Sequence, residues 1–135
     1  MIRLPPEAPA SQLRQDLRRE LSQLLATAET FFERGALVPG QVYETRRRCG
    51  KPSCHCMQEG GHAISLLSVL SPDGRKTRSL SATAKDALLP LVERYRRFRE
   101  ARAAFVRSTK EVVRLADALG DALCARVDLD GLKEA

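Results

Sequence analysis

Residues 49–62 read CGKPSCHCMQEGGH and bring three cysteines and two histidines close together in the chain. A structural zinc site takes four thiolate or imidazole ligands in a tetrahedron, all of them from the protein. The predicted ligands are Cys49, Cys54, Cys56 and His62, with His55 as the alternative fourth ligand. We favour His62 because Gly60-Gly61 lets the chain fold back, whereas His55 sits on a short extended tripeptide and tends to point away from its neighbours. Such a site leaves no open position for a reactive water.

Two other interpretations of the cysteines remain open. In a reducing compartment, clustered cysteines are more often metal ligands than a disulfide framework. They could instead be reduced thiols in a loop, or a redox switch whose thiol pKa values are lowered by basic neighbours. Cys124 lies next to the expected seam of the last helix and is interpreted as a small core or surface residue.

The segments on either side of the cluster predict a small antiparallel sheet. Val42 and Tyr43 begin a strand-like run, and Ile64 to Leu70 form an apolar run of strand length. The sequence SPDG at 71–74 is typical of a turn, so residues 75–80 are expected to return as a second hairpin arm. A sheet this small needs a staple or a covering helix.

An amphipathic helix is expected before the sheet. Ser11 is the predicted N-cap, and the helix should reach about Glu33, with Gly35 as its C-cap. Its apolar residues recur at spacings of three and four: Leu13, Leu17, Leu21, Leu24, Ala28 and Phe31.

A long helix is expected after the sheet, with Ser81 or Thr83 as its cap and Pro90 as a kink or an early start. Its predicted heptad seam consists of Leu88, Leu91, Tyr95, Phe98, Arg102, Phe105, Thr109, Val112, Ala116, Leu119 and Leu123. Arg102 and Thr109 would interrupt this seam, and Arg102 would be costly in a homodimer unless an acid faced it.

The predicted fold class is therefore α+β, mainly α, with two amphipathic helices flanking a zinc-stapled antiparallel sheet. The helices could form an antiparallel hairpin with the sheet at its tip, or the C-terminal helix could pair with its own copy in a homodimer. Residues 1–10 are expected to be a disordered lead and 127–135 a frayed tail. Between them, a single domain over 11–126 comprises a helix at 11–34, the zinc knuckle and hairpin at 38–80, and the long helix at 82–126.

The chain carries 23 Lys and Arg against 17 Asp and Glu, a net charge of +6 that suits an anionic partner. The residues predicted to bind nucleic acid are Arg46, Arg47, Arg48, Lys51, Arg75, Lys76 and Arg78. Any one of these could instead be a solvated surface charge. A further basic run from Arg94 to Arg102 is ambiguous, because Glu93, Glu100 and Glu111 can pair with it along the helix.

Three segments resemble an uncharacterised family of small prokaryotic proteins: VYETRRRCGKPSCHCMQEGGHAISLLSV, GRKTRSL and LVERYRRFRE. The shared pattern is a basic stretch before CGKPxCxC, a glycine-histidine pair, a short sheet and a helix with a Tyr-Arg-Arg motif. The resemblance covers roughly residues 37–115. It implies a mobile-element context, since such proteins are often encoded near transposase or integrase genes. Ala63 and Ile64 depart from the family's more aromatic pattern, which weakens an expectation of aromatic stacking on nucleic acid.

These observations favour a zinc-stabilised, non-catalytic protein that binds nucleic acid, with DNA the favoured partner, as an accessory to a mobile element. The alternative is an adaptor that binds a recombinase or transposase through its coiled-coil helix. An enzyme is not expected, since phosphate-loop, HExxH and GxSxG motifs are absent and both histidines lie beside the cysteines. No apolar run is long enough to span a bilayer and no secretory h-region is seen, so a cytoplasmic location is expected.

Overall fold

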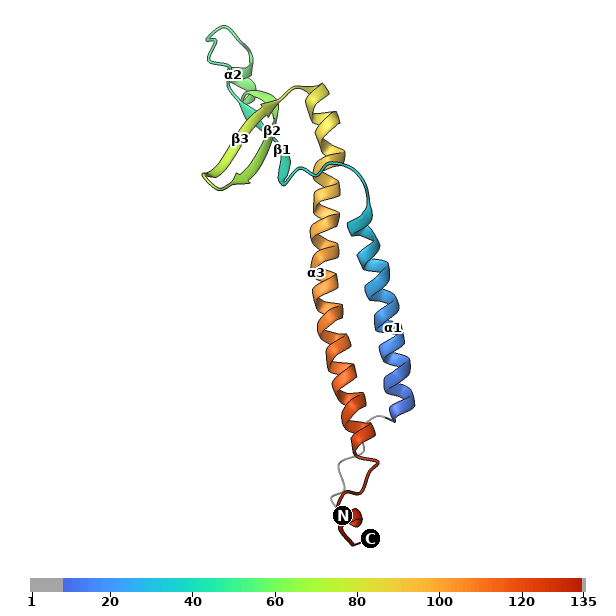
Figure 1. Ribbon diagram of the computed structural model, residues 1–135. Coiled ribbons are helices and arrows are strands. Elements are labelled where there is room, and N and C mark those ends of the chain that lie inside the picture. Colours follow the sequence, from blue (N-terminus) through green and yellow to red (C-terminus); the bar gives the residue numbers. More distant parts are fainter. Residues whose placement is uncertain (1–8, 135) are drawn as a thin grey trace. The chain divides into compact units, whose positions relative to one another are not determined.

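The computed structural model describes residues 9–134, and most of the predicted lead, residues 1–8, lies outside the described residues. Two helices and a three-stranded antiparallel sheet confirm the predicted fold class (Figure 1). The contacts divide the chain into two compact units. We call Arg34–Arg99 the sheet unit, and the chain on either side of it, up to Glu33 and from Glu100, the helical unit. The single domain proposed for residues 11–126 stays a prediction.

The first helix of the helical unit, α1 (Ala10–Ala28), begins earlier than expected. The predicted N-cap, Ser11, is wrong, because Pro9 takes that position and its carbonyl accepts the N–H groups of Gln12 and Leu13. A proline fits there because it has no N–H to leave unpaired and a φ fixed near helical values. The predicted helix end is also too late: α1 tightens into a 3₁₀ turn, η1 (Glu29–Phe32).

The long helix α3 (Ala82–Cys124) contains Pro90 and runs through both units, so its second half lies in the helical unit. It ends two residues before the predicted position 126. Within the predicted frayed tail, the carboxylate of Asp128 accepts the N–H groups of Asp130 and Gly131, and a 3₁₀ turn follows, η2 (Gly131–Glu134).

The buried seam of α3 departs from the predicted one at three places, where Arg102, Thr109 and Ala116 are each replaced by the preceding residue. The other predicted seam residues are half-buried: Leu88, Leu91, Tyr95, Phe98, Phe105, Val112, Leu119 and Leu123. Arg102 and Thr109, the predicted interruptions, are exposed, and the buried residues are Ala101, Ser108 and Leu115. The predicted and the observed residues both recur at spacings of three and four, so this spacing did not choose between them. Arg102 therefore places no buried charge in the seam.

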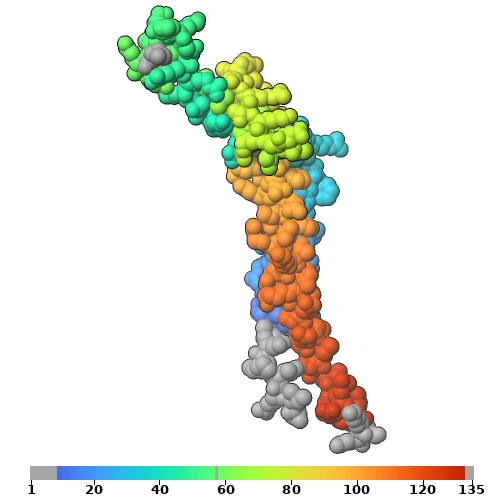
Figure 2. All heavy atoms as spheres, turned by 90° about the vertical axis from the view of Figure 1, so that its left-hand side faces the viewer, coloured from blue at the N-terminus to red at the C-terminus, as the bar shows by residue number. Residues whose placement is uncertain are grey.

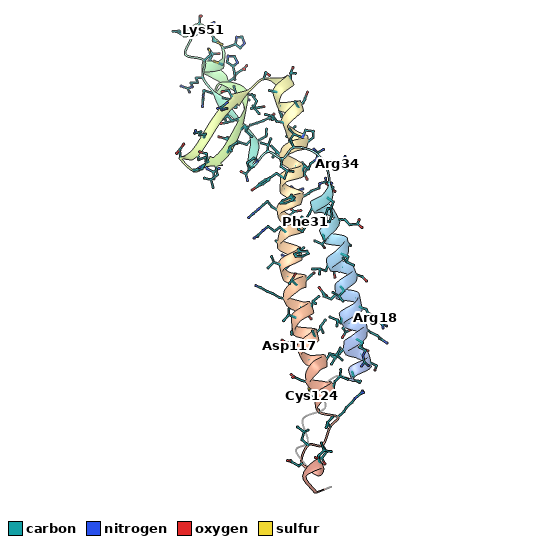
Figure 3. The ribbon with its side chains drawn as sticks, in the orientation of Figure 1. Arg18, Phe31, Arg34, Lys51, Asp117 and Cys124 are labelled. Carbon is teal, nitrogen blue, oxygen red and sulfur yellow. The ribbon has the colours of Figure 1, made fainter. Side chains whose placement is uncertain are left out.

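The two helices of this unit pack through aromatic and aliphatic side chains. Phe31 meets Phe105 edge to face, with ring centroids 5.6 Å apart, and Figure 3 shows Phe31 between the helices. This geometry suits the aromatic quadrupole. Ala10 and Leu13 are buried at the other end of α1. Leu21, one of the apolar residues predicted to form the apolar face of this helix, is instead 39 % exposed.

The sheet unit holds strands β1 (Gly40–Arg47), β2 (His62–Ser71) and β3 (Gly74–Leu80) in the order β1-β2-β3, each antiparallel to its neighbour. This confirms the predicted strands and the turn at 71–74. β2 lies in the centre and is consequently the most apolar strand, with Leu66 and Leu67 buried.

The helix α3 begins with a side-chain cap. The hydroxyl of Ser81 accepts the N–H of Ala84 at 3.1 Å, which confirms Ser81 as a cap.

The first half of α3 also contacts β1 and the residues before it through polar groups within the sheet unit. Lys85 on α3 pairs with Glu44 on β1 at 2.5 Å. The N–H of Val38, just before β1, donates to the carbonyl of Leu91.

The Glu44–Lys85 pair gives a testable pH effect. The hydrogen bond and the charge of Lys85 lower the pKa of Glu44 below its ordinary 4.5. A carboxyl with a lowered pKa stabilises the fold above its unfolded pKa, and that contribution is lost as the pH falls through the folded pKa. An NMR titration should show Glu44 titrating below 4.5, and Lys85→Met should raise its pKa while Lys110→Met leaves it unchanged. An unaltered titration in Lys85→Met would contradict the contact.

Candidate metal centre and basic surface

The candidate metal centre lies where β1 ends and β2 begins. Arg47 and His62 are cross-strand partners, so the sheet register holds the two ends of the intervening segment together. That segment projects beyond these strand ends (Figure 1), and Lys51 marks its far end (Figure 3). It contains a turn, in which the N–H of Cys54 donates to the carbonyl of Lys51, and the single helical turn α2 (Cys56–Glu59).

Two glycines direct the chain from α2 back into β2. Gly60 ends α2 in the left-handed conformation, with φ +85°. Gly61 is buried at φ +108°, and its N–H donates to the carbonyl of Cys56 at 2.7 Å. A Cβ atom on Gly61 would lie 2.6 Å from the backbone carbon of Arg47. Only glycine permits this approach, which aligns His62 with the cysteines.

The four predicted ligands are brought together by this path. Their donor atoms all lie within 4.8 Å of one another, with the sulfurs of Cys49 and Cys56 3.4 Å apart and the Cys54 sulfur 3.4 Å from Nε2 of His62. Donors about 2.3 Å from a tetrahedral metal ion would be separated by about 3.8 Å. The four side chains could therefore hold one metal ion. His55, the alternative ligand, is not part of this cluster.

Backbone N–H groups already bond two of the sulfurs. The N–H of Lys51 bonds the sulfur of Cys49 and, with hydrogen bonds from Cys56 and His62, lowers the pKa of Cys49 to about 6. The N–H of Cys49 bonds the sulfur of Cys56, which lowers the pKa of Cys56. Desolvation and the neighbouring thiols of Cys49 and Cys54 raise this pKa by more, so the pKa of Cys56 lies above its ordinary value. A divalent cation binds the thiolate form, so its binding would displace the protons that these thiols still carry. The sequence did not reveal these backbone donors, because they carry no side-chain signal beyond the turn-forming CGKP.

The cluster is closed on one side and open on the other. Cys56 is only 1 % exposed and Cys54 is half-buried, whereas Cys49 and His62 are exposed. The buried thiol anchors the segment against the sheet ends, while the exposed donors allow a metal ion to enter from solvent.

All seven predicted nucleic-acid-binding residues are exposed. Among residues 9–134, none of the seven pairs with a carboxylate. Arg75 donates to the hydroxyl of Ser68 at 2.8 Å. The ambiguous helical arginines differ, since Arg96 pairs with Glu93.

The sheet register divides the strand cations between two faces. Successive residues of a strand point to opposite faces. Arg46, Lys76 and Arg78 therefore share one face, and Arg47 and Arg75 share the other with His62. The strand cations predicted to bind nucleic acid therefore lie on two faces of the sheet. Figure 2 shows the exposed side chains of β3, coloured yellow-green, spread over the surface toward the viewer.

A family model described as "Domain of unknown function (DUF6788)" matches residues 10–89. The chain belongs to this family. The DUF6788 match covers α1, the sheet and all four candidate ligands and ends within α3. Membership confirms the expected uncharacterised family, while its motif and mobile-element context stay predictions. Neither the curated proteins nor the solved structures gave a match.

Charge in this DUF6788 family member is unevenly distributed. The sheet unit has thirteen Lys and Arg against five Asp and Glu, a net charge of +8. The rest of the chain has ten against twelve, a net charge of −2. The positive excess thus belongs to the unit that holds the metal centre. Across residues 9–134, no helix combines the length and apolar character that a membrane span requires.

Proposed function

We propose that Cys49, Cys54, Cys56 and His62 hold one zinc ion with a structural role. Three thiolates and one imidazole form a donor set typical of structural zinc, and softer donors disfavour magnesium or calcium. The reducing cytoplasm expected for this chain would keep the thiols available as ligands. All four positions of the tetrahedron would be filled by protein, so the proposed role is non-catalytic.

The zinc ion would stabilise the sheet from one end. A three-stranded sheet with few buried side chains has little stability of its own. The metal would link the segment after β1 to the first residue of β2, where Arg47 and His62 pair. It would thereby fix the positions of Arg46, Arg47 and Arg48, which lead into the first ligand.

We propose that this zinc-stabilised sheet unit binds nucleic acid, with DNA as the first candidate, as an accessory to a mobile element. The observation that carries the proposal is that none of the seven predicted basic side chains of the sheet unit pairs with a carboxylate within residues 9–134. Unpaired, exposed Arg and Lys are the groups that neutralise phosphates and release counterions. Such contacts position a protein without reading base sequence.

Binding of the full chain to labelled duplex DNA and to single-stranded RNA tests this function. Affinity should be measurable at low salt, should fall steeply as salt rises, and should vary little with base sequence. Preference for one of the two probes identifies the nucleic acid. Absence of binding to both at low salt would overturn the proposal and leave the metal assignment standing.

A further inference from the structure

The helical unit has the heptad geometry of an antiparallel pair. The half-buried and buried positions alternate at spacings of three and four in each helix. On α1 the a and d positions are Ala10, Leu13, Leu17, Glu20, Leu24 and Thr27, and Phe31 in η1 continues the series. On α3 they are Ala101, Phe105, Ser108, Val112, Leu115 and Leu119. The remaining positions form two flanks, with g and c on one side and e and b on the other.

The g and c flank is closed by charged side chains. Asp16 on α1 and Glu111 on α3 take g positions, and both are half-buried. Arg114, at the adjacent c position, pairs with Glu111 at 2.6 Å. Glu111 and then Asp16 raise the pKa of Arg114, which places all three on the same side of the helix pair.

The opposite flank is apolar and open. Within the helical unit, the exposed large apolar residues of α1, η1 and α3 fall at its e and b positions: Leu21 (39 %), Leu25 (69 %), Phe32 (80 %), Val106 (38 %) and Val113 (54 %). In an antiparallel pair the e positions of one helix face those of the other, so these side chains share one side, which we call the open face. Contiguous exposed apolar side chains of this kind mark an interaction surface.

The charges of the open face all have one sign. The charged residues at its e and b positions are Arg14, Arg18 and Arg102. No Asp or Glu of α1, η1 or the second half of α3 takes an e or b position. None of the three arginines pairs with a carboxylate within the described residues. Arg14 and Arg18 lie toward the N-terminal end of α1, and Arg102 lies at the end near Phe31 and Phe105. The apolar centre is thus bordered by cations at both ends.

We propose that the open face binds an acidic amphipathic helix of another protein. An apolar stripe on the partner would cover Leu25, Phe32 and Val113, and its flanking Glu or Asp residues would face the arginines. A second copy of this chain fits poorly, because two open faces in contact would bring six arginines together without an acid between them. This surface is independent of the proposed nucleic-acid function, since it lies in the other unit.

Designed three-heptad peptides test the proposal directly. One carries Leu at a and d and Glu at e and g, and the other carries Lys in place of Glu. Fluorescence anisotropy should show that the full chain binds the Glu peptide and not the Lys peptide. Leu25→Ser with Val113→Ser should weaken binding by roughly tenfold or more, since buried apolar anchors dominate such contacts. Ala26→Ser with Ala103→Ser, both exposed and outside the open face, is the matched control and should bind normally.

Charge reversal keeps the test independent of folding. Arg18→Glu with Arg102→Glu changes only exposed side chains and should exchange the preference, so that the Lys peptide binds better. Equal binding of both peptides to the natural chain would overturn the proposal. So would sedimentation showing a dimer of the natural chain that Leu25→Ser with Val113→Ser converts to monomer, since a second copy would then occupy the open face.

Discussion

Removing the metal with a strong chelator is expected to lower the stability of the sheet unit by several kcal/mol, because structural zinc contributes apparent binding free energies of about 10–16 kcal/mol in small domains. Hydrogen exchange should show lost protection at the joined ends of β1 and β2, around Arg47 and His62. The seam of the helical unit, which rests on Phe31, Phe105 and Leu115, should keep its protection.

Cysteine variants separate metal loss from chelator effects. Cys56→Ser removes the buried ligand and should reproduce the chelated state, with no further change when chelator is added. Cys124→Ser changes an exposed cysteine outside the cluster and should match the natural chain. Unchanged protection of the strand ends in chelated protein and in Cys56→Ser would show that the sheet needs no metal.

The second large effect concerns nucleic-acid binding. Arg46→Ala, Arg47→Ala and Arg48→Ala together should lower affinity for duplex DNA roughly tenfold or more and reduce the slope of log affinity against log salt by about 3, since each lost phosphate contact removes about 0.9. The weakening should be similar for all DNA sequences, because phosphate contacts carry no base information. Affinity measured at several salt concentrations gives both quantities.

A control variant that removes the same number of positive charges elsewhere on the chain distinguishes binding by a defined surface from attraction by the net charge. Arg107→Ala, Lys110→Ala and Arg126→Ala remove three exposed cations from the helical unit and should change the slope little. Equal losses in the two triple variants would indicate attraction by net charge alone and contradict a defined surface. Two further variants identify the sheet face: Lys76→Ala with Arg78→Ala on one side and Arg75→Ala on the other.

Local signals predicted the metal cluster and the sheet well. The cysteine spacing and the double glycine indicated His62, because a buried Gly61 at positive φ is a local requirement of the turn. The strands followed from short apolar runs bounded by turn residues. Chain-local rules suffice in these regions, since each contact joins residues that the turns bring together.

Features that depend on distant contacts were predicted less well. The seam was displaced at Arg102, Thr109 and Ala116, because spacings of three and four fit these residues and Ala101, Ser108 and Leu115 equally well, and only the packing of the two helices decides between them. The separation of basic residues onto two sheet faces required the strand register, which a sequence does not state. The open face became visible only after the buried residues were placed, because Leu21 and Arg102, which were predicted to lie in the buried stripes, lie on this face.

The measurement that tests the account most directly is the metal content of the purified full chain. Native mass spectrometry should show one zinc ion per chain, and elemental analysis should confirm the metal. Cys54→Ser and His62→Ala should each lose it, whereas His55→Ala should retain it, because His55 lies outside the ligand cluster. A folded, metal-free natural chain, or zinc retained in Cys54→Ser, would contradict the central claim.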